Sequence, residues 1–270
     1  MTAAPIVRRD PVPVLALDAV TVQFPDGHTA LHQLSLTLAR GERVALLGAN
    51  GSGKTTCLQV LAGVRRPTSG TVSLHGVAHD FSVAQRNRWR RHVGMVLADV
   101  DDQLIAPTVR DDVAFGVRNS ATRDAPLSEP EIVGKVQRVL DDLAIGALAD
   151  RAIHSLSLGE RRRVALAGIL VMQPDILLLD EPTVNLDRRA RHALRDLLVR
   201  AATENRTVCL ATHDTTFAWE WATRAVVLES GSVLADDSCS SILRNDALLT
   251  RAALDPPRQD IIRVQTVTRP

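Results

Sequence analysis

Aromatic residues are scarce in this 270-residue chain, which has no tyrosine and in which Phe, Trp and Tyr together make up only 3%. A protein that stacks the bases of single-stranded nucleic acid needs an aromatic surface, so such a function is not expected here. The 32 Lys and Arg residues almost balance the 31 Asp and Glu residues, which leaves a net charge of +1. No overall field attracts nucleic acid or an anionic membrane, and we therefore expect no nucleic-acid partner.

Cysteines and long apolar runs are scarce as well. The three cysteines, Cys57, Cys209 and Cys239, are odd in number and lie in or near predicted core elements, as is typical of reduced thiols in a cytosolic protein. No segment has the roughly 20 consecutive apolar residues that span a bilayer, and residues 1–10 lack the apolar region of a signal peptide. We therefore expect a cytoplasmic protein that reaches a membrane only through another subunit.

The strongest motif is a glycine-rich run, Gly48-Ala49-Asn50-Gly51-Ser52-Gly53-Lys54-Thr55-Thr56. A buried-strand pattern at 43–47 precedes it and a helical pattern at 57–63 follows it, and this order predicts a phosphate-binding loop. Converging backbone N–H groups and the helix N-terminus would bind phosphate oxygens, while Lys54 reaches the β- and γ-phosphates and Thr55 gives its hydroxyl to Mg²⁺. The candidate binding residues are Gly48, Asn50, Gly51, Ser52, Gly53, Lys54, Thr55 and Thr56. The alternative is a flexible turn between two core elements.

Two later apolar strands end in polar groups. Residues 176–179 are aliphatic and lead into Asp180 and Glu181, and ligands of parallel sheets bind at this end of the strands. Asp180 would hold Mg²⁺, and Glu181 would orient the attacking water or accept its proton. His213 follows the strand at 207–212 and is a candidate contact of the γ-phosphate. The alternatives are solvated acids capping a core strand and a packed or capping histidine.

Ser157 and Gly159 mark the start of another predicted helix. Taken locally, Ser157 is an N-cap whose capping box is completed by Glu160, so an ordinary helix start explains the pattern.

The rest of the pattern is that of an α/β protein. Residues 14–24 and 30–38 alternate apolar and polar residues, which predicts antiparallel strands before the glycine-rich run, and strands and helices alternate after residue 158. Further strands are expected at 71–76, 93–97, 176–180, 207–212 and 225–229, and helices at 108–117, 129–143, 158–171, 188–203 and 215–221. Residues 118–130 are expected to form a flexible connection, because they contain several Ser and Pro residues.

With these motifs in order, the sequence resembles the ATP-binding subunits of ABC transporters over about residues 14–255. Residues 156–160 are similar to the family's L-S-G-G-Q signature, 184–187 to its D-loop and His213 to its switch histidine, while Phe24 stands where the family places an aromatic ring against adenine. The resemblance implies a phosphate-loop NTPase fold with an antiparallel β subdomain, a mainly parallel core and a helical subdomain at about 99–171, flanked by an N-terminal extension at 1–13 and a tail at 256–270.

The same resemblance implies an ATPase that uses ATP and Mg²⁺ and works as a homodimer or heterodimer. Ser157 and Gly159 of one subunit would then face the nucleotide held by the phosphate loop of the other. Residues 101–116 and 161–168 are similar to stretches in ATPases of energy-coupling-factor importers and their cobalt and nickel relatives, which import metal cations or vitamins. This likeness implies docking on integral membrane subunits through the region around Asp99 to Gly116, at the inner face of the cell membrane.

Two departures from the family pattern bear on hydrolysis. Ala98 stands where a glutamine usually contacts Mg²⁺, and Leu158 replaces the first glycine of the signature. Asp99 or Gln103 would substitute for the glutamine only through a shifted loop. We therefore expect weaker basal ATPase activity that depends strongly on the partner subunit, and the alternative function is a nucleotide-dependent regulatory or assembly module with weak hydrolysis.

Other classes that share a phosphate loop fit the chain less well. Soluble ABC-type ATPases of translation or DNA maintenance usually carry two nucleotide units or a long coiled coil, and kinases and GTPases do not explain Ser157 and Gly159 together with His213. The chain does not specify the cargo, because membrane and substrate-capture subunits select it.

Overall fold

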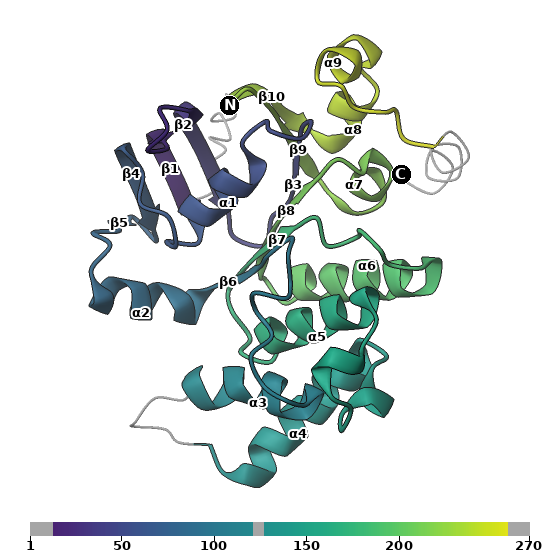
Figure 1. Ribbon diagram of the computed structural model, residues 1–270. Coiled ribbons are helices and arrows are strands. Elements are labelled where there is room, and N and C mark those ends of the chain that lie inside the picture. Colours follow the sequence, from purple (N-terminus) through teal and green to yellow (C-terminus); the bar gives the residue numbers. More distant parts are fainter. Residues whose placement is uncertain (1–12, 121–126, 259–270) are drawn as a thin grey trace, which may run out of the picture.

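The computed structural model describes residues 13–120 and 127–258 (Figure 1). Most of the expected N-terminal extension, the middle of the expected connection at 118–130 and most of the expected tail at 256–270 lie outside these ranges. The described parts fold into two sheets with helices packed around them.

An antiparallel sheet of four strands is built mainly from the N-terminal part of the chain, in the order β2-β1-β4-β5. Its strands are β1 (Pro13–Gln23), β2 (Thr29–Ala39), β4 (Ser69–Leu74) and β5 (Val77–Ala78). Leucines and valines alternate with polar residues along β1 and β2, so each strand buries one face and exposes the other. The sequence predicted this sheet for the same reason.

The second sheet has six strands in the order β10-β9-β3-β8-β7-β6. They are β3 (Arg43–Leu47), β6 (Val93–Val96), β7 (Ile176–Asp180), β8 (Thr207–Thr212), β9 (Arg224–Glu229) and β10 (Ser232–Ser238). Every neighbouring pair is parallel except β9 and β10. The carboxyl ends of β3, β7 and β8 therefore lie at the same edge of the sheet, and this edge receives the glycine-rich loop, Asp180 and His213.

Both faces of the six-stranded sheet are covered, which explains why its central strands are apolar along their whole length. Val44 and Leu46 of β3 point into a core shared with the antiparallel sheet and helix α1 (Lys54–Leu61). Ala45 and Leu47 point into a second core, which the helices on the other face complete. Those include α6 (Arg188–Thr203) and α7 (Thr215–Trp221) (Figure 1).

A group of helices extends from the β6 end of the sheet (Figure 1). It contains α3 (Val109–Ser120), α4 (Glu129–Asp142), the short 3-10 helices η1 (Gly146–Leu148) and η2 (Ile153–Ser155), and α5 (Leu158–Leu170). The buried stripe of α4, which includes Ile132, Val136 and Leu140, packs with α3 and α5 in the second core. Helix α3 continues to Ser120, three residues into the segment that was expected to be a flexible connection.

Among the described residues, three α-helices were not predicted from the sequence: α2 (Val83–His92), α8 (Cys239–Leu243) and α9 (Asp246–Arg251). Only Trp89 is buried in α2, so that helix has no apolar stripe for a pattern to detect. Helices α8 and α9 span only five and six residues, which is too short for a periodic pattern. Among the described residues, no helix is both long enough and apolar enough to cross a membrane.

Candidate nucleotide site

The glycine-rich loop between β3 and α1 has a backbone path that only glycine fits at two positions. A Cβ atom on Gly48 would lie 2.5 Å from the carbonyl oxygen of Leu228 and 2.5 Å from Oγ of Ser52. Gly53 has a φ of +101°, and its Cβ would lie 2.7 Å from the carbonyl oxygen of Ala30. Because both positions are glycine, the chain can curl tightly here and enter α1 at Lys54.

Lys54 lies folded over the loop that precedes it. Its Nζ donates hydrogen bonds to the carbonyl oxygens of Gly48 at 2.7 Å and Ala49 at 3.0 Å. Burial lowers the pKa of Lys54, while the charges of Glu181 and Asp180 act in the opposite direction. A buried ammonium group is thus available at the loop, where it can exchange carbonyl partners for phosphate oxygens.

Asp180, the last residue of β7, is 1% exposed. Among the described residues neither of its carboxylate oxygens has a hydrogen-bond partner of ordinary geometry, although the Thr55 hydroxyl lies close enough to interact with it. Burial raises the pKa of Asp180, an effect that the nearby Thr55 hydroxyl opposes and the charge of Glu181 strengthens. A buried carboxylate without a partner, next to a hydroxyl, provides the oxygen ligands that Mg²⁺ prefers, so these residues fit that ion.

Glu181 and His213 come from neighbouring strand ends and contact each other. Nδ1 of His213 lies 2.9 Å from Oε1 of Glu181, and the Thr212 hydroxyl donates to Oε2 at 3.0 Å. Glu181 directly follows β7 and has a φ of +46°, in the left-handed region that residues other than glycine rarely adopt. Its side chain is 17% exposed, whereas that of His213 is 58% exposed. The pair therefore holds one carboxylate in a fixed position at the mouth of the site.

Ser157 caps α5, as the local pattern predicted. Its hydroxyl accepts a hydrogen bond from the Glu160 N–H, while Oε2 of Glu160 accepts from the Ser157 N–H at 2.7 Å. Gly159 packs against the loop at 184–187, because a Cβ there would lie 2.9 Å from the Asn185 carbonyl oxygen. Leu158 is 39% exposed. Among the described residues, no hydrogen bond joins Ser157 or Gly159 to the glycine-rich loop of the same chain.

Arg162 is a residue of this region for which the sequence suggested no role of its own, only a place in the family likeness at 161–168. Its guanidinium donates one hydrogen bond to the Glu181 carbonyl oxygen and another, of 2.9 Å, to the Ala98 carbonyl oxygen. The side chain is 7% exposed, and burial lowers its pKa. Arg162 thus links α5 to the ends of β6 and β7. Helical spacing offered a signal, since Arg162 lies four residues before the buried Leu166.

Gln103 does not supply the amide group that Ala98 lacks. Its Oε1 accepts a hydrogen bond from the Leu97 N–H at 2.8 Å, and its Nε2 donates to the Met95 carbonyl oxygen at 2.9 Å. Both ends of the amide are therefore bound to backbone groups of Met95 in β6 and of Leu97 just after it, so replacement of the missing glutamine by Gln103 would need the shifted loop and stays a prediction. Asp99 is exposed and caps a local turn, because its Oδ1 accepts from the Asp101 N–H at 3.1 Å.

Phe24 lies at the end of β1 with its ring half-buried. The guanidinium carbon of Arg65 lies 4.7 Å from the ring centroid on one side, and the ring also stacks with His28 at 6.1 Å. An aromatic ring next to a guanidinium group offers a flat surface for a base, and its contact with adenine stays a prediction.

The chain matches known proteins over most of its length. The family described as ABC transporter matches residues 31–184. The cobalt import ATP-binding protein CbiO of Rhodobacter capsulatus is 44% identical over 91% of this chain and 86% of its own length. The energy-coupling factor transporter ATP-binding protein EcfA of Methanothermobacter thermautotrophicus is 38% identical over 91% of this chain and 77% of its own.

Solved structures give the same result. CbiO1 of Clostridium perfringens, part of the ABC transporter complex CbiONQ, superposes with a TM-score of 0.75 and 32% identity, covering 88% of this chain and 94% of that one. The dimeric structure of the ATP-binding cassette MJ0796, in a post-hydrolysis state with ADP and Pi, superposes with a TM-score of 0.75 and 26% identity. The match covers 83% of this chain and 98% of that one. The predicted fold class is confirmed, and the chain belongs to the ABC transporter family of ATP-binding proteins and is an ABC ATPase.

Proposed function

We propose that this chain is the ATP-hydrolysing subunit of a membrane importer for metal cations such as cobalt or nickel, or for vitamins. The observation that carries the ATPase part is the convergence of Lys54, Asp180, Glu181 and His213 at one edge of the parallel sheet. The cargo class rests on the names of relatives such as the cobalt import protein of Rhodobacter capsulatus.

Each of these groups has a part that its position allows. The loop N–H groups and Lys54 bind the β- and γ-phosphates, and Thr55 and Asp180 hold Mg²⁺, which when bound neutralises charge on the phosphates. Glu181 orients the attacking water and accepts its proton, because its carboxylate is held by His213 and the Thr212 hydroxyl. His213 is exposed enough to contact the γ-phosphate as well.

A second ATP-binding subunit completes the site in this proposal. The N-terminus of α5 carries Ser157 and the exposed Leu158, and it binds no group of its own glycine-rich loop. A helix N-terminus favours an anion, so it suits the phosphates held by the opposite subunit. The partner is a second copy or a related chain, and a partner with an unaltered signature would offset Leu158.

The surface for the membrane subunits is the region around Asp99 to Gly116. Within it, Ile105 is 63% exposed and Phe115 49% exposed, so the region offers two large apolar side chains to a partner. Asp112 holds the Ile105 segment in place, because its Oδ1 accepts hydrogen bonds from the Ile105 and Ala106 N–H groups. We expect this apolar surface to receive a coupling element of the membrane subunit on the inner face of the membrane.

Membrane attachment tests the importer part. The full chain and an Ile105→Asp, Phe115→Asp variant are each expressed with the native membrane subunits, and the fraction that sediments with membranes is measured. The variant is expected to lose attachment, while Val83→Asp, at a 64% exposed apolar position on α2, is expected to keep it. Equal attachment of all three proteins would reject this docking surface. Uptake of Co²⁺, Ni²⁺ and vitamins by the same cells then distinguishes the cargo classes.

A regulatory or assembly module with weak hydrolysis is the second candidate function, and the contacts of Ala98 and Gln103 favour it. Within the part of the chain that the structure describes, no free amide side chain is seen at the end of β6 to orient water or contact Mg²⁺, since Gln103 is bound to backbone. An assembled complex that binds ATP tightly but does not import cargo faster than a Lys54→Ala complex would support this alternative.

A further inference from the structure

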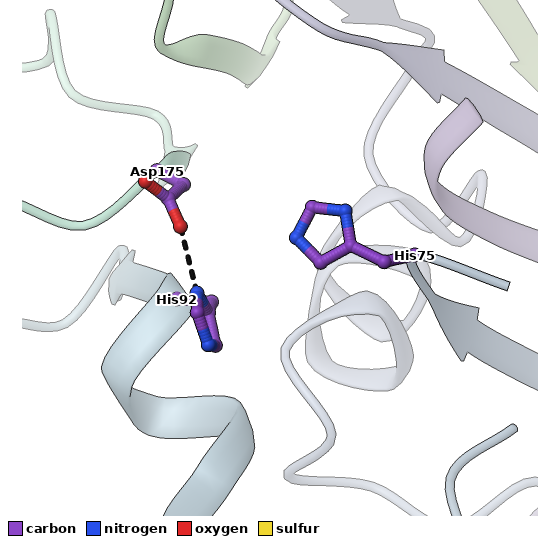
Figure 2. A group of neighbouring side chains, drawn as sticks. All are labelled: His75, His92 and Asp175. Carbon is purple, nitrogen blue, oxygen red and sulfur yellow. Dashed lines mark hydrogen bonds and ion pairs between the residues drawn. The ribbon is translucent and has the colours of Figure 1, made fainter. Parts of the chain in front are cut away.

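Three side chains come together at the amino ends of β6 and β7, the opposite ends of these strands from the nucleotide edge. His75, His92 and Asp175 each offer a ligand atom, and these atoms all lie within 4.8 Å of one another. Figure 2 shows the His75 ring facing the pair formed by the other two, in which Nδ1 of His92 lies 2.7 Å from Oδ2 of Asp175. His92 directly precedes β6 and Asp175 directly precedes β7, so the cluster lies about 17 Å from Asp180 along β7.

Well-defined main chain positions all three residues. His75 and Gly76 form the two-residue turn between β4 and β5, with φ values of +50° and +77°, and the His75 N–H donates to the Val14 carbonyl oxygen at 2.9 Å. His92 ends α2 at its junction with β6. The Asp175 carbonyl oxygen accepts from the Thr207 N–H of β8 at 2.9 Å. Ligands on such elements keep their spacing without a bound ion.

The spacing and the donor types suit a transition metal. A tetrahedral ion with bonds of about 2.0–2.1 Å holds its ligand atoms about 3.4 Å apart. The 2.7 Å pair and the 4.8 Å limit bracket this value, so small movements of the exposed His75 and Asp175 and the half-buried His92 would bring the three atoms to this spacing. Two imidazoles with one carboxylate favour Zn²⁺, Co²⁺ or Ni²⁺ over Mg²⁺ or Ca²⁺, which prefer oxygen ligands alone.

The local charges act in both directions. The carboxyl end of α2 points its partial negative charge toward His92, which favours a cation. Arg90 and Arg91 in the last turn of α2 oppose it, but both are exposed, so solvent screens them. Asp175 supplies a full negative charge to the cluster. A cation bound through coordinate bonds to His75 and His92 does not depend on this long-range balance.

We infer that His75, His92 and Asp175 form a binding site for one divalent transition metal ion, separate from the nucleotide site. The bound ion joins the β4–β5 turn of the antiparallel sheet to the starts of β6 and β7. It therefore stabilises the contact between the two sheets. This inference does not rest on the proposed transport function, because it concerns a site that the ATPase reaction does not use.

Titration of the full-length chain tests the site. The protein is freed of metal with a chelator and titrated with Zn²⁺ alone by calorimetry, and one tight site is expected. Loss of an outer contact to a metal ligand typically costs about 10–100-fold in affinity, so His75→Ala with His92→Ala is expected to cost at least about 100-fold. His154→Ala, at an exposed histidine, is the control and is expected to bind as the parent does.

Two further readouts separate a metal site from an ordinary ion pair. Co²⁺ is expected to give a visible ligand-field spectrum with the parent that the double variant lacks. Zn²⁺ is expected to raise the midpoint of thermal unfolding of the parent and not of Asp175→Asn, which keeps a hydrogen-bond acceptor for His92 but is a poorer ligand. Absence of a tight site in the parent, or parental affinity in the double variant, would overturn the inference and leave only a surface contact between His92 and Asp175.

Discussion

Asp180 offers a test in which stability and function change in opposite directions. The residue is 1% exposed and, among the described residues, its carboxylate has no hydrogen-bond partner of ordinary geometry, so its charge is buried at a cost that the Thr55 hydroxyl and the charges of Lys54 and Arg162 offset only in part. Asp180→Asn removes this charge with almost no change in volume. We therefore expect the nucleotide-free variant to be more stable than the parent and to bind Mg²⁺-dependent nucleotide more weakly.

The size of the effect follows from the environment of the carboxylate. A buried polar group without a partner costs about 1–3 kcal/mol, and more when it is charged. The variant still buries an amide, and Lys54 loses a favourable charge, so we expect a net gain of about 1 kcal/mol in the free energy of unfolding. In a domain of this size that corresponds to a rise of about 2–4 °C in the midpoint of thermal unfolding.

The pH dependence has a definite sign. Burial raises the folded-state pKa of Asp180 above its ordinary value of about 3.9. The ionised carboxylate therefore destabilises the fold, and this penalty grows as the pH rises from the ordinary pKa through the folded-state pKa. The difference in thermal unfolding between variant and parent should be smallest near pH 4 and reach its full size at about pH 7.

Thermal unfolding of the nucleotide-free proteins by circular dichroism measures these differences. Asp102→Asn, at an exposed aspartate, is the matched control and is expected to leave the midpoint unchanged. An Asp180→Asn protein that is less stable than the parent at neutral pH, or a difference that does not vary with pH, would refute the view that this charge is buried at a net cost.

Other substitutions test the geometry around the site. Gly53→Ala places a Cβ within 2.7 Å of a β2 carbonyl oxygen, whereas the Cβ of Gly51→Ala meets open space. We therefore expect Gly53→Ala to lower ATP affinity and the midpoint of thermal unfolding more than Gly51→Ala does. Equal losses in the two variants would refute the contact argument. Arg162→Lys cannot keep both hydrogen bonds, so we expect a loss of about 1.5–3 kcal/mol in stability and slower turnover with ATP affinity retained, measured by unfolding and steady-state kinetics. Ala98→Gln with Leu158→Gly is expected to raise ATP turnover of the assembled complex, and an unchanged rate would mean that both departures are neutral.

Local patterns were sufficient for the elements that form the nucleotide edge. The predicted bounds of β7, β8, α6 and α7 match the structure, because apolar strands and capped helices with clear ends alternate there. The Ser157 capping box was also predicted, since it depends on residues only three apart. Helix α2 was missed because one buried tryptophan gives no periodic signal.

Contacts between segments distant in sequence needed the structure. The bond between Glu181 and His213 depends on β7 and β8 being neighbours, and strand order is set by tertiary packing rather than by local pattern. The same holds for Arg162, whose two carbonyl partners lie 19 and 64 residues away. The amide of Gln103 was suggested as a replacement at the nucleotide site, but hydrogen bonds to the adjacent β6 backbone satisfy it. Family likeness supplied roles for single residues and could not supply these pairings.

The hydrolysis rate of the Glu181→Gln variant shows whether Glu181 is the general base of ATP hydrolysis. Glutamine keeps the shape of the side chain but cannot accept a proton from water, so the loss of a general base should lower the rate about 100-fold or more. Steady-state ATPase activity is measured on the assembled complex, with nucleotide binding measured in parallel. We expect this loss of turnover with ATP binding preserved, and equal hydrolysis rates for parent and variant would show that Glu181 is not the general base.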